Sequence, residues 1–102
     1  MNYIVFDLEW NQCPYGKERE NRRLPFEILE IGAVKLDENR KIVDSFQEVI
    51  KPAVYKKLHF RTREILDLDA RALNRGMSLS KGSEEIFCLV RGRCKILYLG
   101  LF

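Results

Sequence analysis

Two acidic residues near the N-terminus, Asp7 and Glu9, have a spacing that could support metal chemistry. They follow a short apolar run, residues 3–6, whose β-branched and aromatic side chains favour a buried strand. Because side chains alternate between the faces of a strand, the two carboxylates project together while Leu8 points the other way. Neighbouring carboxylates repel each other unless a cation lies between them, and hard oxygen ligands suit Mg²⁺ or Mn²⁺. The pattern fits a metal site, and it also fits an ordinary strand that ends in two solvated acids.

Two further apolar segments could place these carboxylates in a sheet. Residues 26–36 form a strong apolar run, and residues 41–50 alternate well enough to form another strand. The polar turn 37–40 between them predicts a hairpin. We therefore expect residues 2–9, 26–36 and 41–50 to form a three-stranded antiparallel meander, and the apolar tail could add a strand next to the first.

Helices are expected between the third strand and the tail. Residues 54–68 fit helices better than strands, and residues 69–75 form a plausible short helix that Gly76 closes as a C-cap. Ser80 is expected to cap a following helix, which Gly92 ends.

Over residues 1–80 the chain resembles the DEDD-type 3′–5′ exonucleases, which include ribonuclease T, the proofreading exonucleases and the ERI-1-like exoribonucleases. Residues 6–9, Phe-Asp-Leu-Glu, look like the first exonuclease motif of that family. Residues 30–34, Glu-Ile-Gly-Ala-Val, look like its second strand. The runs Asp-Leu-Glu-Trp-Asn and Leu-Pro-Phe-Glu-Ile look closest to the ERI-1-like branch. The resemblance implies an α/β (α+β), ribonuclease H-like exonuclease fold in truncated form, with helices on the faces of the meander.

The resemblance also implies an activity and a set of site residues. The family hydrolyses phosphodiester bonds at the 3′ end of single-stranded RNA or DNA with two ions of Mg²⁺ or Mn²⁺, and the ERI-1-like branch favours RNA. Asp7 and Glu9 would be the catalytic and metal-binding residues. Contacts with nucleic acid are expected from Leu8, Trp10, Asn11 and Leu68, although Trp10 could equally belong to the core. Two further acids, Glu27 and Glu30, match positions that are mainly structural in the family, and we assign them no catalytic role.

The second half of the family pattern is missing. No Asp or Glu follows Glu85, so the second and third motifs, including the His or Tyr general base, have no counterpart. We interpret residues 1–92 as the N-terminal part of an exonuclease domain that is inactive alone, and residues 93–102 as a divergent tail. Codons for residues 93–100, read in a shifted frame, could encode Asp-Val-Arg-Phe-Cys-Thr-Trp-Gly. Because that peptide resembles the one that precedes the second catalytic aspartate in ERI-1-like members, we hypothesise a frameshift.

Basic residues gather in two stretches that could contact phosphates. The loop 11–25 holds several cations interleaved with Glu18 and Glu20, so a solvated mobile loop is the favoured interpretation. Residues 56–63 form the most basic stretch, and the single histidine within it, His59, is expected on the surface rather than in catalysis. A catalytically dead nucleic-acid-binding or interaction module is therefore the alternative function, with a non-functional gene remnant as a third possibility.

Length, charge and cysteine usage set broad limits. A chain of 102 residues corresponds to one small domain, and its net charge of +3 is compatible with a polyanionic ligand without requiring one. Three cysteines without a close pair (Cys13, Cys88 and Cys94) predict neither a disulfide framework nor a zinc site. Free thiols and the lack of a signal peptide predict the cytoplasm. No run approaches the roughly 20 apolar residues of a membrane helix.

Overall fold

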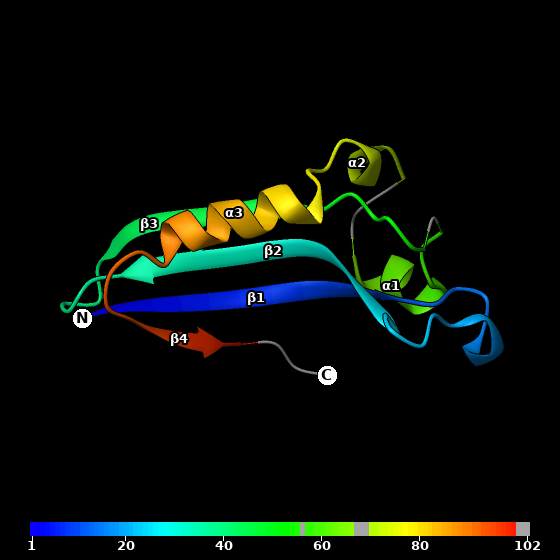
Figure 1. Ribbon diagram of the computed structural model, residues 1–102, viewed down its shortest axis with the longest axis horizontal. Helices are drawn as coiled ribbons and strands as arrows, with labels where there is room; N and C mark the ends of the chain where they lie inside the picture. Colours follow the sequence, from blue (N-terminus) through cyan, green and yellow to red (C-terminus); the bar gives the residue numbers. More distant parts are fainter. Residues whose placement is uncertain (56, 67–69, 100–102) are drawn as a thin grey trace.

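A four-stranded sheet with the strand order β3-β2-β1-β4 organises the chain (Figure 1). The computed structural model describes residues 1–55, 57–66 and 70–99. β1 (Asn2–Gln12), β2 (Phe26–Leu36) and β3 (Ile42–Val49) form an antiparallel meander, and β4 (Cys94–Tyr98) lies parallel to β1. The meander and its approximate bounds confirm the predicted strands. The fourth strand shows that the tail joins the sheet beside β1, and the helices over the sheet confirm the α/β class.

The turn between β2 and β3 is held by backbone hydrogen bonds and by the Asp37 carboxylate. Asp37 accepts hydrogen bonds from the backbone N–H groups of Asn39 at 2.8 Å and Lys41 at 3.0 Å. Arg40 takes a φ of 64°, in the left-handed region that such turns require. This local bonding fixes the hairpin, and with it the register between β2 and β3.

One of the three described helices runs along the sheet, and two lie at its far end. α3 (Leu79–Leu89) packs along β2 and β3, whereas α1 (Phe60–Ile65) and α2 (Ala70–Asn74) lie beyond the end of β3, as Figure 1 shows. A 3₁₀ turn, η1 (Lys17–Arg19), lies in the loop between β1 and β2. None of the helices within the described residues has the length and hydropathy needed to cross a membrane.

Two expectations about helix ends are wrong. The N-cap of α3 is Ser78 rather than Ser80, because the Ser78 hydroxyl accepts the N–H of Lys81 at 3.1 Å while Ser80 already lies in the first turn. Gly76 is required by close packing rather than by a left-handed C-cap. A Cβ at Gly76 would lie 2.7 Å from the backbone oxygen of Val49, so no side chain fits where this segment crosses the end of β3.

Two separate hydrophobic cores stabilise the fold. The first lies between the sheet and α3 and consists of Ile4, Ala33 and Leu89, with partly buried apolar side chains around them. The second lies at the far end of the sheet, where its buried members are Leu29, Leu58 and Leu73. The first core holds α3 on the sheet, and the second holds the segment that follows β3 against β2.

Candidate active site

Alternation along β1 separates the core-forming residues from the two candidate carboxylates. Ile4 and Phe6 point toward α3 and pack in the first core. Asp7 and Glu9 therefore project from the opposite face, where Asp7 is exposed and Glu9 is half-buried. The structure thus brings these two residues together on one open face of the sheet, as the sequence predicts.

The electrostatics of this face disfavour ionisation of Glu9. Its pKa is raised above the ordinary value by partial burial, then by the charge of Asp7, and then by the charge of Glu30. The Asp7 carboxylate accepts the N–H of Leu8 at 3.0 Å, which orients one of its oxygens. A divalent cation between the two carboxylates would remove their mutual repulsion.

Glu30, to which the sequence interpretation assigned no catalytic role, lies next to this carboxylate pair. Antiparallel pairing places Glu30 directly opposite Glu9, with Gly32 opposite Asp7. Gln47 on β3 donates a hydrogen bond from its side-chain amide to the Glu30 carboxylate at 3.0 Å, which holds that side chain over the sheet. The pairing register of β1 and β2 would have placed Glu30 beside Glu9. The sequence does not fix that register, because a long polar loop joins the two strands.

The donor set fits a weakly held hard cation. Asp7 and Glu9 supply carboxylate oxygens, the ligands that Mg²⁺ and Mn²⁺ prefer. Within the described residues, no group of three or more His, Cys, Asp or Glu side chains could enclose a metal ion. Two carboxylates on an open face leave most coordination positions to water or to a bound phosphate.

A shallow hollow of about 340 Å³ lies beside Asp7. Its apolar walls include Val5 and Val34, and its polar rim includes Ser45 and Gln47. The hollow has room for a small group next to the Asp7 carboxylate.

The structure places two of the expected contact residues, Leu8 and Trp10, away from this face. Leu8 points toward α3 and lines an apolar groove with Phe6 and Ile31. The Trp10 ring packs edge-on against Phe26, with centroids 6.5 Å apart, and its indole N–H donates to the Tyr98 hydroxyl at 3.4 Å. Leu68 lies outside the described residues. The expected contacts of Leu8 and Trp10 with a substrate at Asp7 and Glu9 are therefore not supported by the side-chain directions.

Asn11 has a structural role instead of the expected contact with nucleic acid. The residue is 0% exposed. Its side-chain amide donates to the backbone oxygen of Lys57 at 3.0 Å, and its amide oxygen accepts the N–H of His59 at 2.9 Å. Both hydrogen-bonding ends are used, so Asn11 joins the end of β1 to the segment that begins α1.

Glu27 is structural, as the sequence interpretation assumed. The residue is buried, and its carboxylate accepts three backbone N–H groups at 2.7–2.8 Å, those of Ala53, Val54 and Tyr55. It anchors the loop that follows β3. Of the two glutamates on β2, Glu27 anchors a loop and Glu30 lies next to the carboxylate pair.

No family model matches this sequence, and no curated protein sequence matches it. The fold, in contrast, matches solved structures. A full-length 3′-exonuclease superposes with a TM-score of 0.74 at 18% identity, covering 98% of this chain and 46% of that one. The nuclease domain of 3′hExo, a DEDDh family member bound to rAMP, gives 0.75 at 17% identity, with 97% of this chain and 52% of that chain covered.

A third structure shows 3′-end-specific recognition of a histone mRNA stem-loop by a 3′-exonuclease, and it gives a TM-score of 0.75 at 18% identity. The superposition covers 97% of this chain and 36% of that one. The chain therefore has the fold of the DEDD-type exonucleases, and it spans about half or less of the length of these structures.

Proposed function

We propose that the chain is the N-terminal part of a 3′–5′ exonuclease that hydrolyses phosphodiester bonds at the 3′ end of single-stranded nucleic acid, with RNA as the favoured substrate. The observation that carries the proposal is the pair Asp7 and Glu9 on the open face of the first strand, in a fold that the chain has in common with 3′-exonucleases. Three free thiols fit a reducing compartment, which for this proposal is the cytoplasm.

Asp7 and Glu9 would hold Mg²⁺ or Mn²⁺. When bound, such an ion supplies activation of water and stabilisation of charge on the leaving oxygen. Glu9 must be ionised to contribute a ligand, and its raised pKa means that protons compete with the cation more strongly there than at an ordinary glutamate. Glu30 adds negative potential next to Glu9 and so attracts cations to the face.

We expect little activity from this chain alone. The family arranges four carboxylates around two ions, and this chain offers Asp7 and Glu9 without the later motifs. Loss of a single group of such a unit typically lowers the rate by orders of magnitude. A nucleic-acid-binding module without catalysis is the second candidate, favoured by the missing carboxylates of the later motifs and by the basic stretch 56–63.

Residues 93–102 are the second part of the proposal. We attribute the lost motifs to a shift of reading frame within this tail, and the test is to sequence the coding DNA. A frame that cannot encode Phe-Cys-Thr-Trp-Gly at this place would exclude the frameshift without affecting the assignment of Asp7 and Glu9.

Mn²⁺ binding and strand trimming test the function. We expect the chain to bind Mn²⁺ weakly by isothermal titration calorimetry, and Asp7→Asn to abolish that binding. Asp44→Asn is the matched control, because Asp44 is also exposed on a strand and also accepts the N–H of the next residue, at 2.8 Å.

On 5′-labelled single-stranded RNA with Mn²⁺, the chain should show little or no trimming. Extension with the residues of the alternative frame and those downstream should restore it. Mn²⁺ binding that survives Asp7→Asn would contradict the metal assignment. Trimming by the short chain that disappears in Asp7→Ala would instead show that the site is complete without the later motifs.

A further inference from the structure

An aromatic and cationic stack stands at the beginning of α1. The rings of His59 and Phe60 stack with centroids 4.6 Å apart and planes at 29°, and the Arg61 guanidinium lies 5.8 Å from the centroid of Phe60. The His59 ring is held in place because its Nδ1 accepts the N–H of Arg61 at 3.2 Å. Phe60 is nevertheless 64% exposed, so this apolar ring faces solvent beside a cation.

Hydrogen bonds attach the segment of this stack to the end of β1 that follows the carboxylate pair. Asn11 bonds the backbone of Lys57 and His59, and the Thr62 hydroxyl donates to the backbone oxygen of Trp10 at 3.5 Å. Asn11 follows Glu9 by two residues on β1, so it projects from the same face, about 7 Å further along the strand. The segment that carries Phe60 is thus attached to the carboxylate face next to Glu9.

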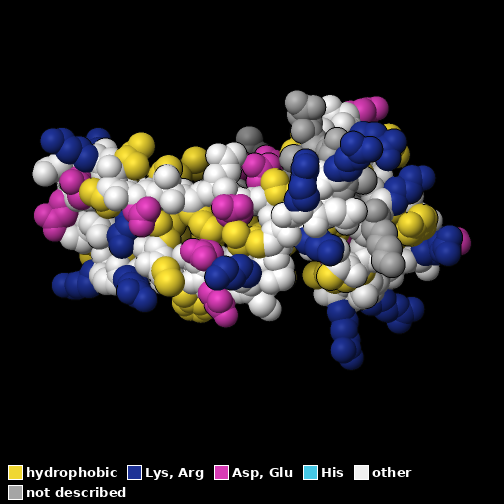
Figure 2. Space-filling view, turned by 90° about the horizontal axis from the view of Figure 1, so that it is seen from above, with side chains coloured by type: hydrophobic (Ala, Val, Ile, Leu, Met, Phe, Trp, Pro, Cys, Tyr) yellow, Lys and Arg dark blue, Asp and Glu magenta, His cyan; other side chains and the backbone are white. Residues whose placement is uncertain are grey.

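The stack belongs to a basic region at one end of the molecule, which we call the distal lobe: residues 13–25, 51–55 and 57–66. Tyr55 joins the segment 51–55 to the loop 13–25, because its hydroxyl donates to the backbone oxygen of Leu24 at 2.7 Å and accepts the N–H of Asn21 at 3.1 Å. A second exposed aromatic residue in the lobe, Tyr15, carries the Arg19 guanidinium 5.1 Å from its ring centroid. Figure 2 shows lysine and arginine side chains gathered around this end, on the right of the view.

The cations of the lobe are available to a ligand. The ion pairs found within the described residues lie elsewhere, between Met1 and Glu38 and between Lys81 and Glu85. No carboxylate of the described residues lies within ion-pair distance of the lobe cations, which are Lys17, Arg19, Arg22, Arg23, Lys51, Lys57, Arg61 and Arg63. Exposed aromatic rings next to unpaired arginines are the groups with which proteins bind single strands, through base stacking and phosphate contacts.

We propose that the distal lobe binds the part of a single-stranded nucleic acid that leads away, in the 5′ direction, from the end held at Asp7 and Glu9. Phe60 provides a face on which a base stacks, and Arg61 contacts a backbone phosphate. This proposal rests on the proposed function, because it takes the carboxylate pair as the place of the 3′ end. It adds a surface that holds the strand several nucleotides from that end, and it concerns residues with no part in metal binding.

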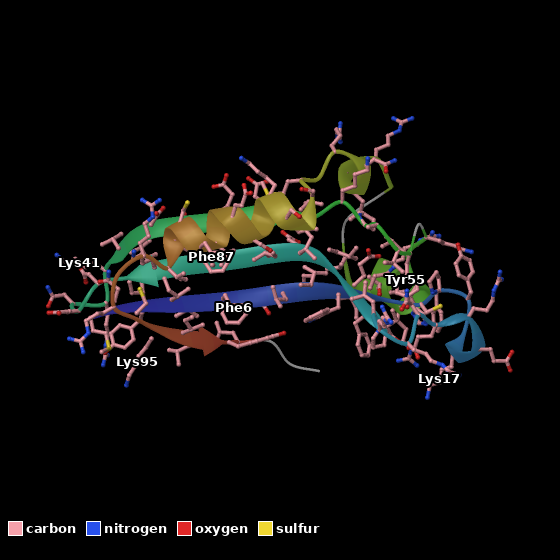
Figure 3. All side chains as sticks on the ribbon, in the orientation of Figure 1. Phe6, Lys17, Lys41, Tyr55, Phe87 and Lys95 are labelled. Carbon is pink, nitrogen blue, oxygen red and sulfur yellow. The ribbon has the colours of Figure 1, made fainter. Side chains whose placement is uncertain are left out.

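The test uses the full chain without divalent metal and measures binding of labelled single strands of about 12 nucleotides, within the site size of known single-strand binders. Phe60→Ala removes the stacking face, and Phe87→Ala is its control, because Phe87 is 75% exposed on α3. Arg61→Ala removes the phosphate contact, and Lys41→Ala is its control at the opposite end of the molecule, where Figure 3 labels it.

Phe60→Ala and Arg61→Ala should weaken strand binding in different ways. Loss of one stacked base weakens binding about tenfold, so Phe60→Ala should show this loss on oligo(A) and none on an abasic strand of equal length. Phe60→Leu, which keeps the apolar bulk without the flat ring, should resemble Phe60→Ala. Arg61→Ala should weaken binding to both strands and lower the slope of log K against log salt by about 0.7, the value for one phosphate of a single strand.

The outcomes separate this proposal from the proposed function. If Phe60→Ala binds like Phe87→Ala, or Arg61→Ala like Lys41→Ala, the lobe is not the strand-binding surface, while Mn²⁺ binding by Asp7 still decides the function. Failure of the unaltered chain to bind any strand would overturn the lobe proposal as well. Equal losses on oligo(A) and the abasic strand in Phe60→Ala would also overturn it, because they would show that the ring only supports α1.

Discussion

The two faces of β1 use the same backbone for opposite purposes. On one face Ile4, 2% exposed, packs with Ala33 and Leu89 under α3. On the other face Asp7 and Glu9 lie side by side, where burial and neighbouring charges raise the pKa of Glu9. Burial of apolar area stabilises the first face, and charge repulsion destabilises the second. The difference indicates that stability and metal affinity are carried by different residues of one strand, so substitutions can separate them.

The largest expected change in the free energy of unfolding comes from a substitution on the face of β1 that α3 covers. Ile4→Ala should lower the free energy of unfolding by about 3 kcal/mol, because it removes a fully buried side chain and leaves a cavity. Val5→Ala, one residue along on the open face, should lower it by less than about 1 kcal/mol, since Val5 is only half-buried. Urea unfolding followed by circular dichroism measures both values. Equal losses would contradict the assignment of the two faces.

The two glutamates of β2 extend the comparison to the next strand. Glu27→Ala should lower the free energy of unfolding by about 2 kcal/mol, because the three backbone N–H groups that it accepts lose their partner and only some regain water. Glu30→Ala removes an acid that neighbours Glu9 and Gln47 and should leave stability nearly unchanged. Amide hydrogen exchange at residues 53–55 measures the effect locally. Unchanged exchange in Glu27→Ala would show that water replaces the carboxylate fully.

Features that depend on nearby residues could be predicted from the sequence. The apolar runs and the polar turn at 37–40 give the meander, and alternation places Asp7 and Glu9 on one face. The tail enters the sheet as β4, which its apolar composition allowed. These features depend on periodicity of two and on turn chemistry, which act over a few residues.

Features that depend on distant partners could not be predicted. Asn11 looked like a contact for nucleic acid, yet its side chain bonds backbone groups that are 46 and 48 residues away. Glu30 lies opposite Glu9 in a pairing register that shifts between Glu9 and Trp10, where Leu29 of β2 has no partner on β1. The need for glycine at Gly76 arises because the backbone of residues 49–51 passes too close for a side chain. Each depends on tertiary geometry that no local pattern encodes.

The smallest expected change in the free energy of unfolding comes from substitutions on the open face of β1. The same substitutions should have the clearest effect on the pKa of Glu9. Because the folded-state pKa of Glu9 is raised, the folded state binds its proton more tightly than the unfolded state does. The stability that this provides is complete below the ordinary glutamate pKa and is lost as the pH rises through the raised pKa.

Asp7→Asn should lower the pKa of Glu9 part of the way toward its ordinary value, because burial, the larger cause, and Glu30 remain. The free energy of unfolding at neutral pH should rise slightly, by less than about 0.5 kcal/mol. Glu9→Gln should abolish the loss of stability that accompanies deprotonation of Glu9 as the pH rises. Asp44→Asn should leave the Glu9 titration unchanged. An NMR titration that follows the side-chain carboxyl carbon of Glu9 measures the change in its pKa directly. If Asp7→Asn leaves this titration unchanged, the two carboxylates do not interact, and they would not share a cation as the proposed function requires.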